Sequence, residues 1–136
     1  MREILFRGKC FHTEEWVEGY LGIEVPDELV IQQFSYDEYF KSNCIDQYSV
    51  KPETIGQYTG LTDKNGMKIF EGDVIHGKLG NFVVRWNEYI GAFVAFVSPK
   101  IMPCLNRGTM KSYEVIGNIH DNPELIGGIW ETDNET

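Results

Sequence analysis

The sequence contains no apolar run that approaches the roughly 18 residues of a membrane-spanning helix. Its N-terminus also lacks a basic stretch leading into a short apolar segment, the pattern of a secretion signal. With 42% hydrophobic and 13% aromatic residues among 136, the chain can still form a core, because a domain of this size buries roughly two-thirds of its unfolded surface. We expect a folded cytoplasmic protein with no membrane partner, made of one domain or of one domain with an appendage.

Cysteine is scarce, and its spacing excludes two kinds of framework. Cys10, Cys44 and Cys104 are odd in number, and none has a second cysteine three positions away, so neither a disulfide scaffold nor a zinc ribbon is indicated. Cys10 and His12 are alternate residues that would share one face of a strand, where Cys104 and His120 could join them at a metal. Buried thiols and surface imidazoles explain the same residues equally well.

Motifs of enzymes and nucleotide-binding proteins are also missing. The sequence has no phosphate-binding loop ending in Lys and Ser or Thr, and no strand-linked G-x-G-x-x-G. Its adjacent carboxylates fall in turn-like segments, where neighbouring side chains point to opposite sides and remain solvated. We therefore expect no enzymatic activity, no catalytic or metal-binding residue and no cofactor.

The formal net charge of −9 disfavours binding to nucleic acid or to anionic lipid. The charge is uneven, however. Residues 1–54 hold five basic and eleven acidic residues, a net of −6, whereas residues 74–113 hold five basic residues against Glu88 alone, a net of +4. An acidic N-terminal half suits a decoy that imitates nucleic acid, and equally a soluble surface. The basic segment predicts an alternative nucleic-acid site, in which cations contact phosphates and an aromatic ring stacks on bases. Its candidate residues are Lys78, Arg85, Tyr89, Lys100, Arg107 and Lys111.

The N-terminal segment favours strands. Residues 4–7 and 16–21 are two β-favouring runs, and the polar stretch between them predicts a hairpin turn. Ser35 and Glu38 have the spacing of a capping box, in which each side chain satisfies a free amide at the start of a helix. The sequence therefore predicts a short helix that ends before Asn43.

Turn signals become denser in the second half of the chain. Asn65 and Gly66 in the segment TDKNG can adopt the positive φ angles of a tight hairpin turn. Gly72 interrupts the next run, while Asn122 and Pro123 place a cap and a preset φ at the start of a helical turn. Further strands are expected over residues 82–86, 92–97 and 113–119, with a hairpin tip at 87–90.

Two blocks of this sequence resemble a known family. They are VKPETIGQYTGLTDKNGMKIFEGDVI at 50–75 and YEVIGNIHDNPEL at 113–125, and the opening runs REILFRGK and EEWVEGYLG fit them. They are similar to the YopX-like proteins of bacteriophages and prophages, whose function is not established. The resemblance implies a mainly β fold with a compact SH3-like β-barrel in the C-terminal half. It divides the chain into an N-terminal β-hairpin with a variable loop and short helix (1–54), the barrel (55–130) and a flexible tail (131–136).

The functional expectation follows from the resemblance together with the missing motifs. We expect a phage or prophage accessory protein that binds an unidentified host or phage protein without catalysis; the alternative is a nucleic-acid-binding small β-barrel. Because an SH3-like barrel is incompletely closed, the runs at 4–7 and 16–21 must either cover it or pair with another copy, which favours a homo-oligomer.

Overall fold

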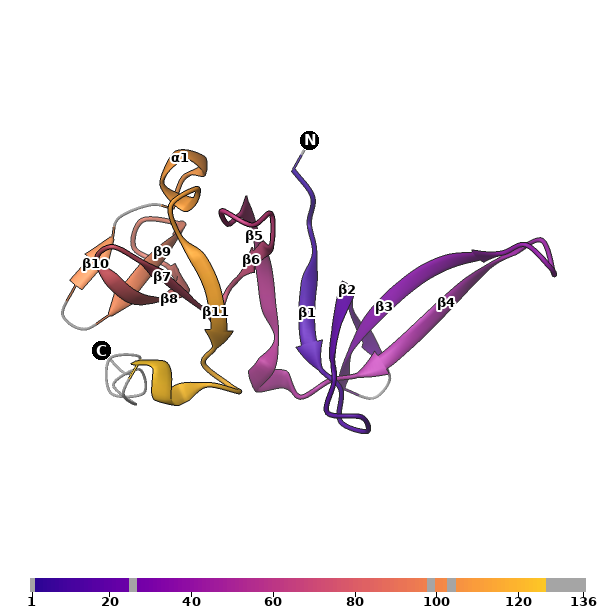
Figure 1. The fold of residues 1–136 in the computed structure, drawn as a ribbon. Helices are drawn as coiled ribbons and strands as arrows, with labels where there is room; N and C mark the ends of the chain where they lie inside the picture. Colours follow the sequence, from indigo (N-terminus) through magenta and orange to yellow (C-terminus); the bar gives the residue numbers. More distant parts are fainter. Residues whose placement is uncertain (1, 25–26, 98–99, 103–104, 127–136) are drawn as a thin grey trace. The chain divides into compact units, whose positions relative to one another are not determined.

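The computed structural model describes residues 2–24, 27–97, 100–102 and 105–126 (Figure 1). The chain is mainly β, as predicted, and its strands pair antiparallel throughout the described part. It divides into two compact units, Met1–Gln57 and Tyr58–Thr136, so the division falls three residues after the one expected from the sequence. The predicted tail, 131–136, lies outside the described residues.

The first unit is built from four strands and the start of a fifth. β1 (Phe6–Lys9) and β2 (Trp16–Glu24) form the predicted hairpin, with Lys9 opposite Trp16. β2 then changes partner and pairs with β3 (Glu28–Asp37), which pairs with β4 (Ser42–Ser49). A 3₁₀ turn, η1 (Pro52–Thr54), leads into β5 (Gly56–Thr62), whose first residues pair with the other side of β1. Phe6 and Arg7 are therefore paired on both sides within the chain, so at these residues the run has no edge left for another copy, while the expected self-association stays a prediction.

The predicted short helix at Ser35–Glu38 is wrong. β3 continues through Ser35 to Asp37, and the chain turns back over residues 38–41. Asp37 Oδ1 accepts the amide N–H groups of Tyr39 at 2.8 Å and of Phe40 at 3.1 Å, which fixes the turn. Ser35 faces Cys44 in the ladder, so cross-strand pairing outweighs the local capping-box pattern.

The second unit contains an open five-stranded sheet. Its spatial order is β10-β9-β8-β7-β11, and the predicted strands at 82–86, 92–97 and 113–119 all occur in it. The bounds are β6 (Lys68–Phe70), β7 (Asp73–Gly77), β8 (Gly80–Asn87), β9 (Ala92–Val97), β10 (Lys100–Met102) and β11 (Glu114–Asn118), with a short helix α1 (Arg107–Met110) and a 3₁₀ turn η2 (Pro123–Ile126).

This sheet does not close into the expected SH3-like barrel. β10 and β11 are its two edges, and no strand pairing between them is found among the described residues. Among the described strands β6 pairs with β5 alone, and β6 and β10 have three residues each, too few to bridge a ring. A register shift between Val115 and Gly117 in β11 supplies local curvature instead, since a bulge bends a strand without closing a sheet.

This sheet has an apolar cluster on each of its two faces, and β7 and β8 contribute residues to both clusters. Ile75, Phe82 and Val84 pack with Ala95 and with Met110 of α1 on one face. Val74 and Val83 pack with Ile126 of η2 on the other. The expected central position of the strand 92–97 agrees with its place between β8 and β10.

The turn between β5 and β6 spans Asp63 to Met67. Gly66 has a φ of 80°, as a tight turn requires, and its N–H donates to the Asp63 carbonyl at 3.0 Å. Asn65 does not share this conformation, since the described non-glycine residues with positive φ are only Glu14 and Lys41. The predicted two-residue turn is thus a longer one, in which the Asp63 carboxylate accepts the amides of Asn65 and Met67.

Replacing Gly66 by valine is expected to destabilise the protein by about 1–2 kcal/mol, because a β-branched side chain is strained at positive φ. A Cβ atom at this position would meet no other atom within 4 Å, so backbone strain is the whole effect. Gly66→Asn should cost less, since Asn tolerates the left-handed region. Thermal unfolding of the two variants checks this, and an equal melting temperature for valine and wild type would contradict the assigned turn.

Candidate interaction surface

The outer part of the β3–β4 hairpin is a two-stranded arm. Pairing between β2 and β3 begins at Tyr20 opposite Gln32, whereas β3 and β4 stay paired as far as Asp37 opposite Ser42. Residues 33–46, called the arm here, therefore have no third strand within the described part of the first unit, as Figure 1 shows. A two-stranded hairpin without a packed face is only marginally stable in water.

One face of the arm is apolar and open to solvent. Side chains alternate across a strand, so Phe34 and Tyr36 share a face with Ile45, which lies directly opposite Phe34. The exposed fractions are 56% for Phe34, 57% for Tyr36 and 58% for Ile45. Tyr20 of β2 extends this face, with its ring centroid 5.5 Å from that of Phe34 and 53% of its surface exposed. These four residues define the apolar face.

The opposite face of the arm is polar. By the same alternation it carries Ser35 and Asp37 from β3, with Ser42, Cys44 and Asp46 from β4. At the tip, Tyr39 and Phe40 are 87% and 73% exposed, and their rings meet edge to face at 4.8 Å. The arm is therefore amphipathic, and its apolar side ends in an aromatic tip.

The β8–β9 hairpin of the second unit repeats this geometry. Asn87 Oδ1 accepts the amides of Tyr89 at 2.9 Å and of Ile90 at 3.3 Å, as Asp37 does for Tyr39 and Phe40. Each turn places its last loop residue at positive φ, 63° for Gly91 and 52° for Lys41. Both loops have four residues between the last paired positions. The sequences Asp-Glu-Tyr-Phe-Lys and Asn-Glu-Tyr-Ile-Gly thus form equivalent tips.

Equivalent positions on the two hairpins differ in burial. Counting back from the tips, Phe34 corresponds to Val84 and Ile45 to Ala95. Val84 and Ala95 are fully buried in the second unit, where Met110 belongs to the same core. At Phe34 and Ile45 the arm is therefore exposed where the second unit has core residues, whereas Trp86, the counterpart of Tyr36, is itself 43% exposed.

On β3 and β4 the apolar face has no charged neighbour on its own side, whereas on β2 the exposed Glu18 alternates with Tyr20 and borders it. Along the arm its neighbours are Asn43 and the pair Gln32 and Gln47, whose side chains are hydrogen-bonded to each other at 2.6 Å. A satisfied amide pair is much cheaper to bury than a lone amide. The alternation of Phe34, Tyr36 and Ile45 along paired strands was the sequence signal for this surface, and sequence reasoning missed it.

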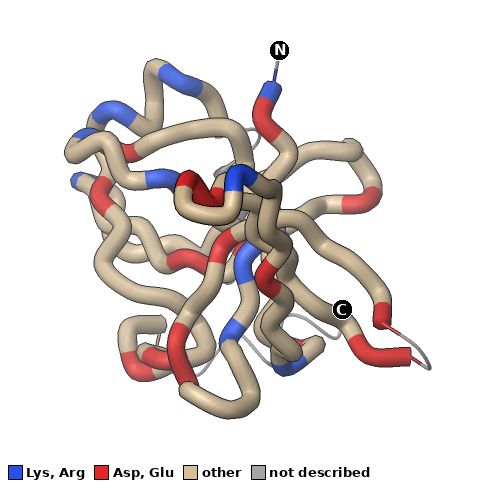
Figure 2. Tube along the Cα trace, turned by 90° about the vertical axis from the view of Figure 1, so that its right-hand side faces the viewer, with Lys and Arg blue, Asp and Glu red and all other residues tan. Residues whose placement is uncertain are grey.

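The proposed nucleic-acid residues do not gather on one face of the sheet. Arg85 alternates with Val84 on β8, so it points to the side opposite α1, and its guanidinium lies 4.6 Å from the Phe96 ring centroid. Arg107 and Lys111 are exposed on and beside α1, whereas Lys78 lies in the β7–β8 turn. Tyr89 is exposed at its hairpin tip, and the side chain of Lys100 lies outside the described part. Figure 2 marks Lys and Arg at separate points of the trace, with Asp and Glu among them.

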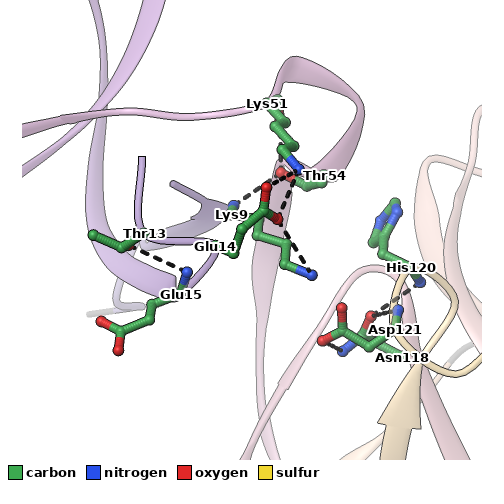
Figure 3. Close-up of polar contacts among 9 residues, drawn as sticks. All are labelled: Lys9, Thr13, Glu14, Glu15, Lys51, Thr54, Asn118, His120 and Asp121. Carbon is green, nitrogen blue, oxygen red and sulfur yellow. Dashed lines mark hydrogen bonds and ion pairs between the residues drawn. The ribbon is translucent and has the colours of Figure 1, made fainter. Parts of the chain in front are cut away.

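The β1–β2 turn holds Cys10 and His12, but they do not share a strand face as predicted. Cys10 is buried and ends the strand with a bridge to Val50, and the chain turns immediately after it. Hydrogen bonds from the Thr13 hydroxyl and amide lower the pKa of the Cys10 thiol below its usual value, against the effect of burial. The Glu14 carboxylate in this turn accepts hydrogen bonds from Lys51 Nζ at 2.7 and 2.8 Å (Figure 3).

Of the other two predicted metal ligands, one belongs to the second unit and one is not described. The His120 amide donates to Asn118 Oδ1 at 3.0 Å in a turn of the second unit (Figure 3), and Cys104 lies outside the described residues. No group of three or more His, Cys, Asp or Glu residues suited to a metal is found in the described ranges.

The remaining predicted turn residues lie at chain reversals. Gly72 has a φ of 94° between β6 and β7. Asn122 Oδ1 accepts the Asn118 amide at 3.2 Å, and Pro123 is the first residue of η2.

Comparisons with known proteins identify a family without naming an activity. No curated protein matches the chain. A solved structure described as the crystal structure of protein EF1440 from Enterococcus faecalis is similar in fold, with a TM-score of 0.61 and 23% identity, covering 93% of this chain and 99% of that one. Within the described part, no helix has the length and apolar character needed to traverse a bilayer. The family model for the YopX protein matches residues 5–127, so the chain belongs to the YopX family.

Proposed function

We propose that this protein is a phage- or prophage-type accessory protein that acts in the cytoplasm as a non-enzymatic protein-binding module. Its binding surface is the apolar face of the arm, continued by the aromatic tip. The observation that carries the proposal is the comparison of the two hairpins. The counterparts of Phe34 and Ile45 on an equivalent hairpin belong to a core in the second unit, whereas Phe34 and Ile45 are open to solvent in the first.

The chemistry of this face favours a protein over a nucleic acid. Exposed aromatic and aliphatic side chains clustered on a paired strand hairpin resemble the anchors of protein interfaces. Phosphates require Lys or Arg, and the arm holds Lys41 against Asp37, Glu38 and Asp46, a net of −2.

Site-specific photo-crosslinking in bacterial cells tests the proposal. A benzophenone amino acid in place of Phe34 should give a protein adduct, because that position faces the bound partner. The same group in place of Ser35, the adjacent position on the polar face, is the matched control and should give at least about tenfold less adduct, since interface energy is concentrated in few anchors. Absence of adducts at Phe34, or equal yields at both positions, would overturn the proposed function.

A further inference from the structure

We infer that the apolar face of the arm is covered by the same face of a second copy of this chain, which makes the protein a symmetric dimer joined through its β3–β4 arms. The inference rests on the proposed function and names its partner. In such an interface each residue of the face is used twice, once by each copy.

Charge is the first argument for a second copy. Each chain carries a formal net charge of −9, so two copies repel except where their surfaces approach without charged groups. Phe34, Tyr36 and Ile45 provide such a place on the arm, since Asp37 and Asp46 alternate to its other side and Glu18 lies only at the border, beside Tyr20. A strongly basic partner, by contrast, would leave its cations opposite an uncharged surface.

The available area is the second argument. Aromatic side chains bury about 150–250 Å² each, so the exposed fractions of the apolar face and of Tyr39 and Phe40 amount to roughly 700 Å². A standard stable interface takes about 800 Å² from each partner. The apolar face and the aromatic tip of one copy together therefore supply nearly one side of a stable dimer.

The arrangement of side chains is the third argument. Phe34 and Ile45 lie directly opposite each other across the ladder, and the tilted ring of Tyr20 flanks Phe34 at 57°. Two sheets packed face to face interdigitate alternating side chains of this kind. At the polar border of the face, Gln32 and Gln47 are hydrogen-bonded to each other at 2.6 Å. Covering this border with a second copy would therefore leave few polar groups without a hydrogen-bond partner.

A charge exchange at Ile45 tests the dimer in the full-length protein. Sedimentation equilibrium over a dilution series should give wild type about twice 15.7 kDa at high concentration, falling towards the monomer on dilution. Ile45→Lys and Ile45→Glu should each weaken dimerisation by at least about 100-fold, because like charges meet across the two-fold axis. An equimolar mixture of the two variants should regain the dimer, since opposite charges then face each other.

Asp46→Lys is the matched control, because it changes charge at the neighbouring position on the polar face. It should leave the mass of the protein unchanged. A concentration-independent wild-type mass near 15.7 kDa would overturn the inference, as would a dimer that persists in Ile45→Lys and in Ile45→Glu. If the circular dichroism spectrum shows that either Ile45 variant is unfolded, the test rests on two other measurements. These are the mass of the wild type across the dilution series and the mass of Phe34→Ser, which also changes the apolar face. A monomeric wild type that still crosslinks from Phe34 to a different protein would refute the dimer and retain the proposed function.

Discussion

Replacing Gly19 with alanine is expected to unfold the sheet of the first unit. A Cβ atom at Gly19 would overlap the carbonyl oxygen of Gln32, and would lie 3.0 Å from its carbonyl carbon and 2.9 Å from the Ile31 Cγ2 atom. The neighbouring residue Tyr20 pairs with Gln32, so the clash falls on backbone held in the ladder. Overpacking costs about 1–3 kcal/mol and more where backbone cannot move, so the melting temperature of this unit should fall by on the order of 10 °C or more.

Gly22 provides a control in the same strand. A Cβ atom there would approach the Gln32 side-chain amide at 3.2–3.3 Å and a Val30 methyl group at 3.3 Å, and the long Gln32 side chain can yield. Gly22→Ala should therefore stay within about 1 kcal/mol of wild type. Circular dichroism melts of both variants make the comparison, and equal losses at Gly19 and Gly22 would show that strand propensity, not the close approach of β2 and β3, controls stability.

Removing the carboxylate of Asp63 should cost about 3 kcal/mol, because three part-buried backbone amides lose their acceptor at about 1 kcal/mol each. Asp63 is 1% exposed, and its oxygens accept the N–H groups of Asn65 at 2.8 Å, Met67 at 2.9 Å and Val115 at 2.9 Å. The residue thereby fastens the β5–β6 turn to the start of β11. Urea unfolding of Asp63→Ala measures the loss, and a change below about 1 kcal/mol would contradict this role.

The same residue predicts how stability depends on pH. Burial raises the pKa of Asp63, but the hydrogen bonds from the amides of Val115, Met67 and Asn65 outweigh it, so the pKa lies below the ordinary value of 3.8. The carboxylate therefore contributes its full stabilisation well above pH 3.8, the ordinary pKa. This contribution is lost as the pH falls through the pKa of Asp63 in the folded protein, which is lower. Urea unfolding of wild type and of Asp63→Asn should be measured from pH 6 downwards. The free energies of unfolding of the two proteins should converge in acid, whereas a constant difference between them would exclude a contribution from Asp63 ionisation.

The second unit was largely predictable from its sequence, because its turns carry strong local signals. Gly66 and Gly72 lie at positive φ where the chain reverses, and the hairpin tip before Gly91 was expected from the glycine itself. The closed barrel was not predictable in the same way. Closure depends on the length and register of strands far apart in sequence, and β6 and β10 proved too short for it.

The arm shows why the first unit was harder to predict. The tip at Asp37 is equivalent to the tip at Asn87, but it places Lys41 where the other has Gly91, so the usual mark of a left-handed residue is missing. Ser35 and Glu38 also fit a capping box. This pattern is local, so it contains no information about the pairing of this segment with residues 42–49. Comparing the two Glu-Tyr segments with each other would have revealed the second hairpin.

The two equivalent hairpins use the same positions differently: one fills them with core residues and the other with exposed residues. Val84 and Ala95 hold the second unit's core, so exchanging them costs folding stability. Their counterparts Phe34 and Ile45 are exposed and belong to no core cluster in the described part of the first unit, so we expect their exchange to leave the fold intact. Side chains on the arm can therefore change one at a time on a scaffold whose folding depends on other residues.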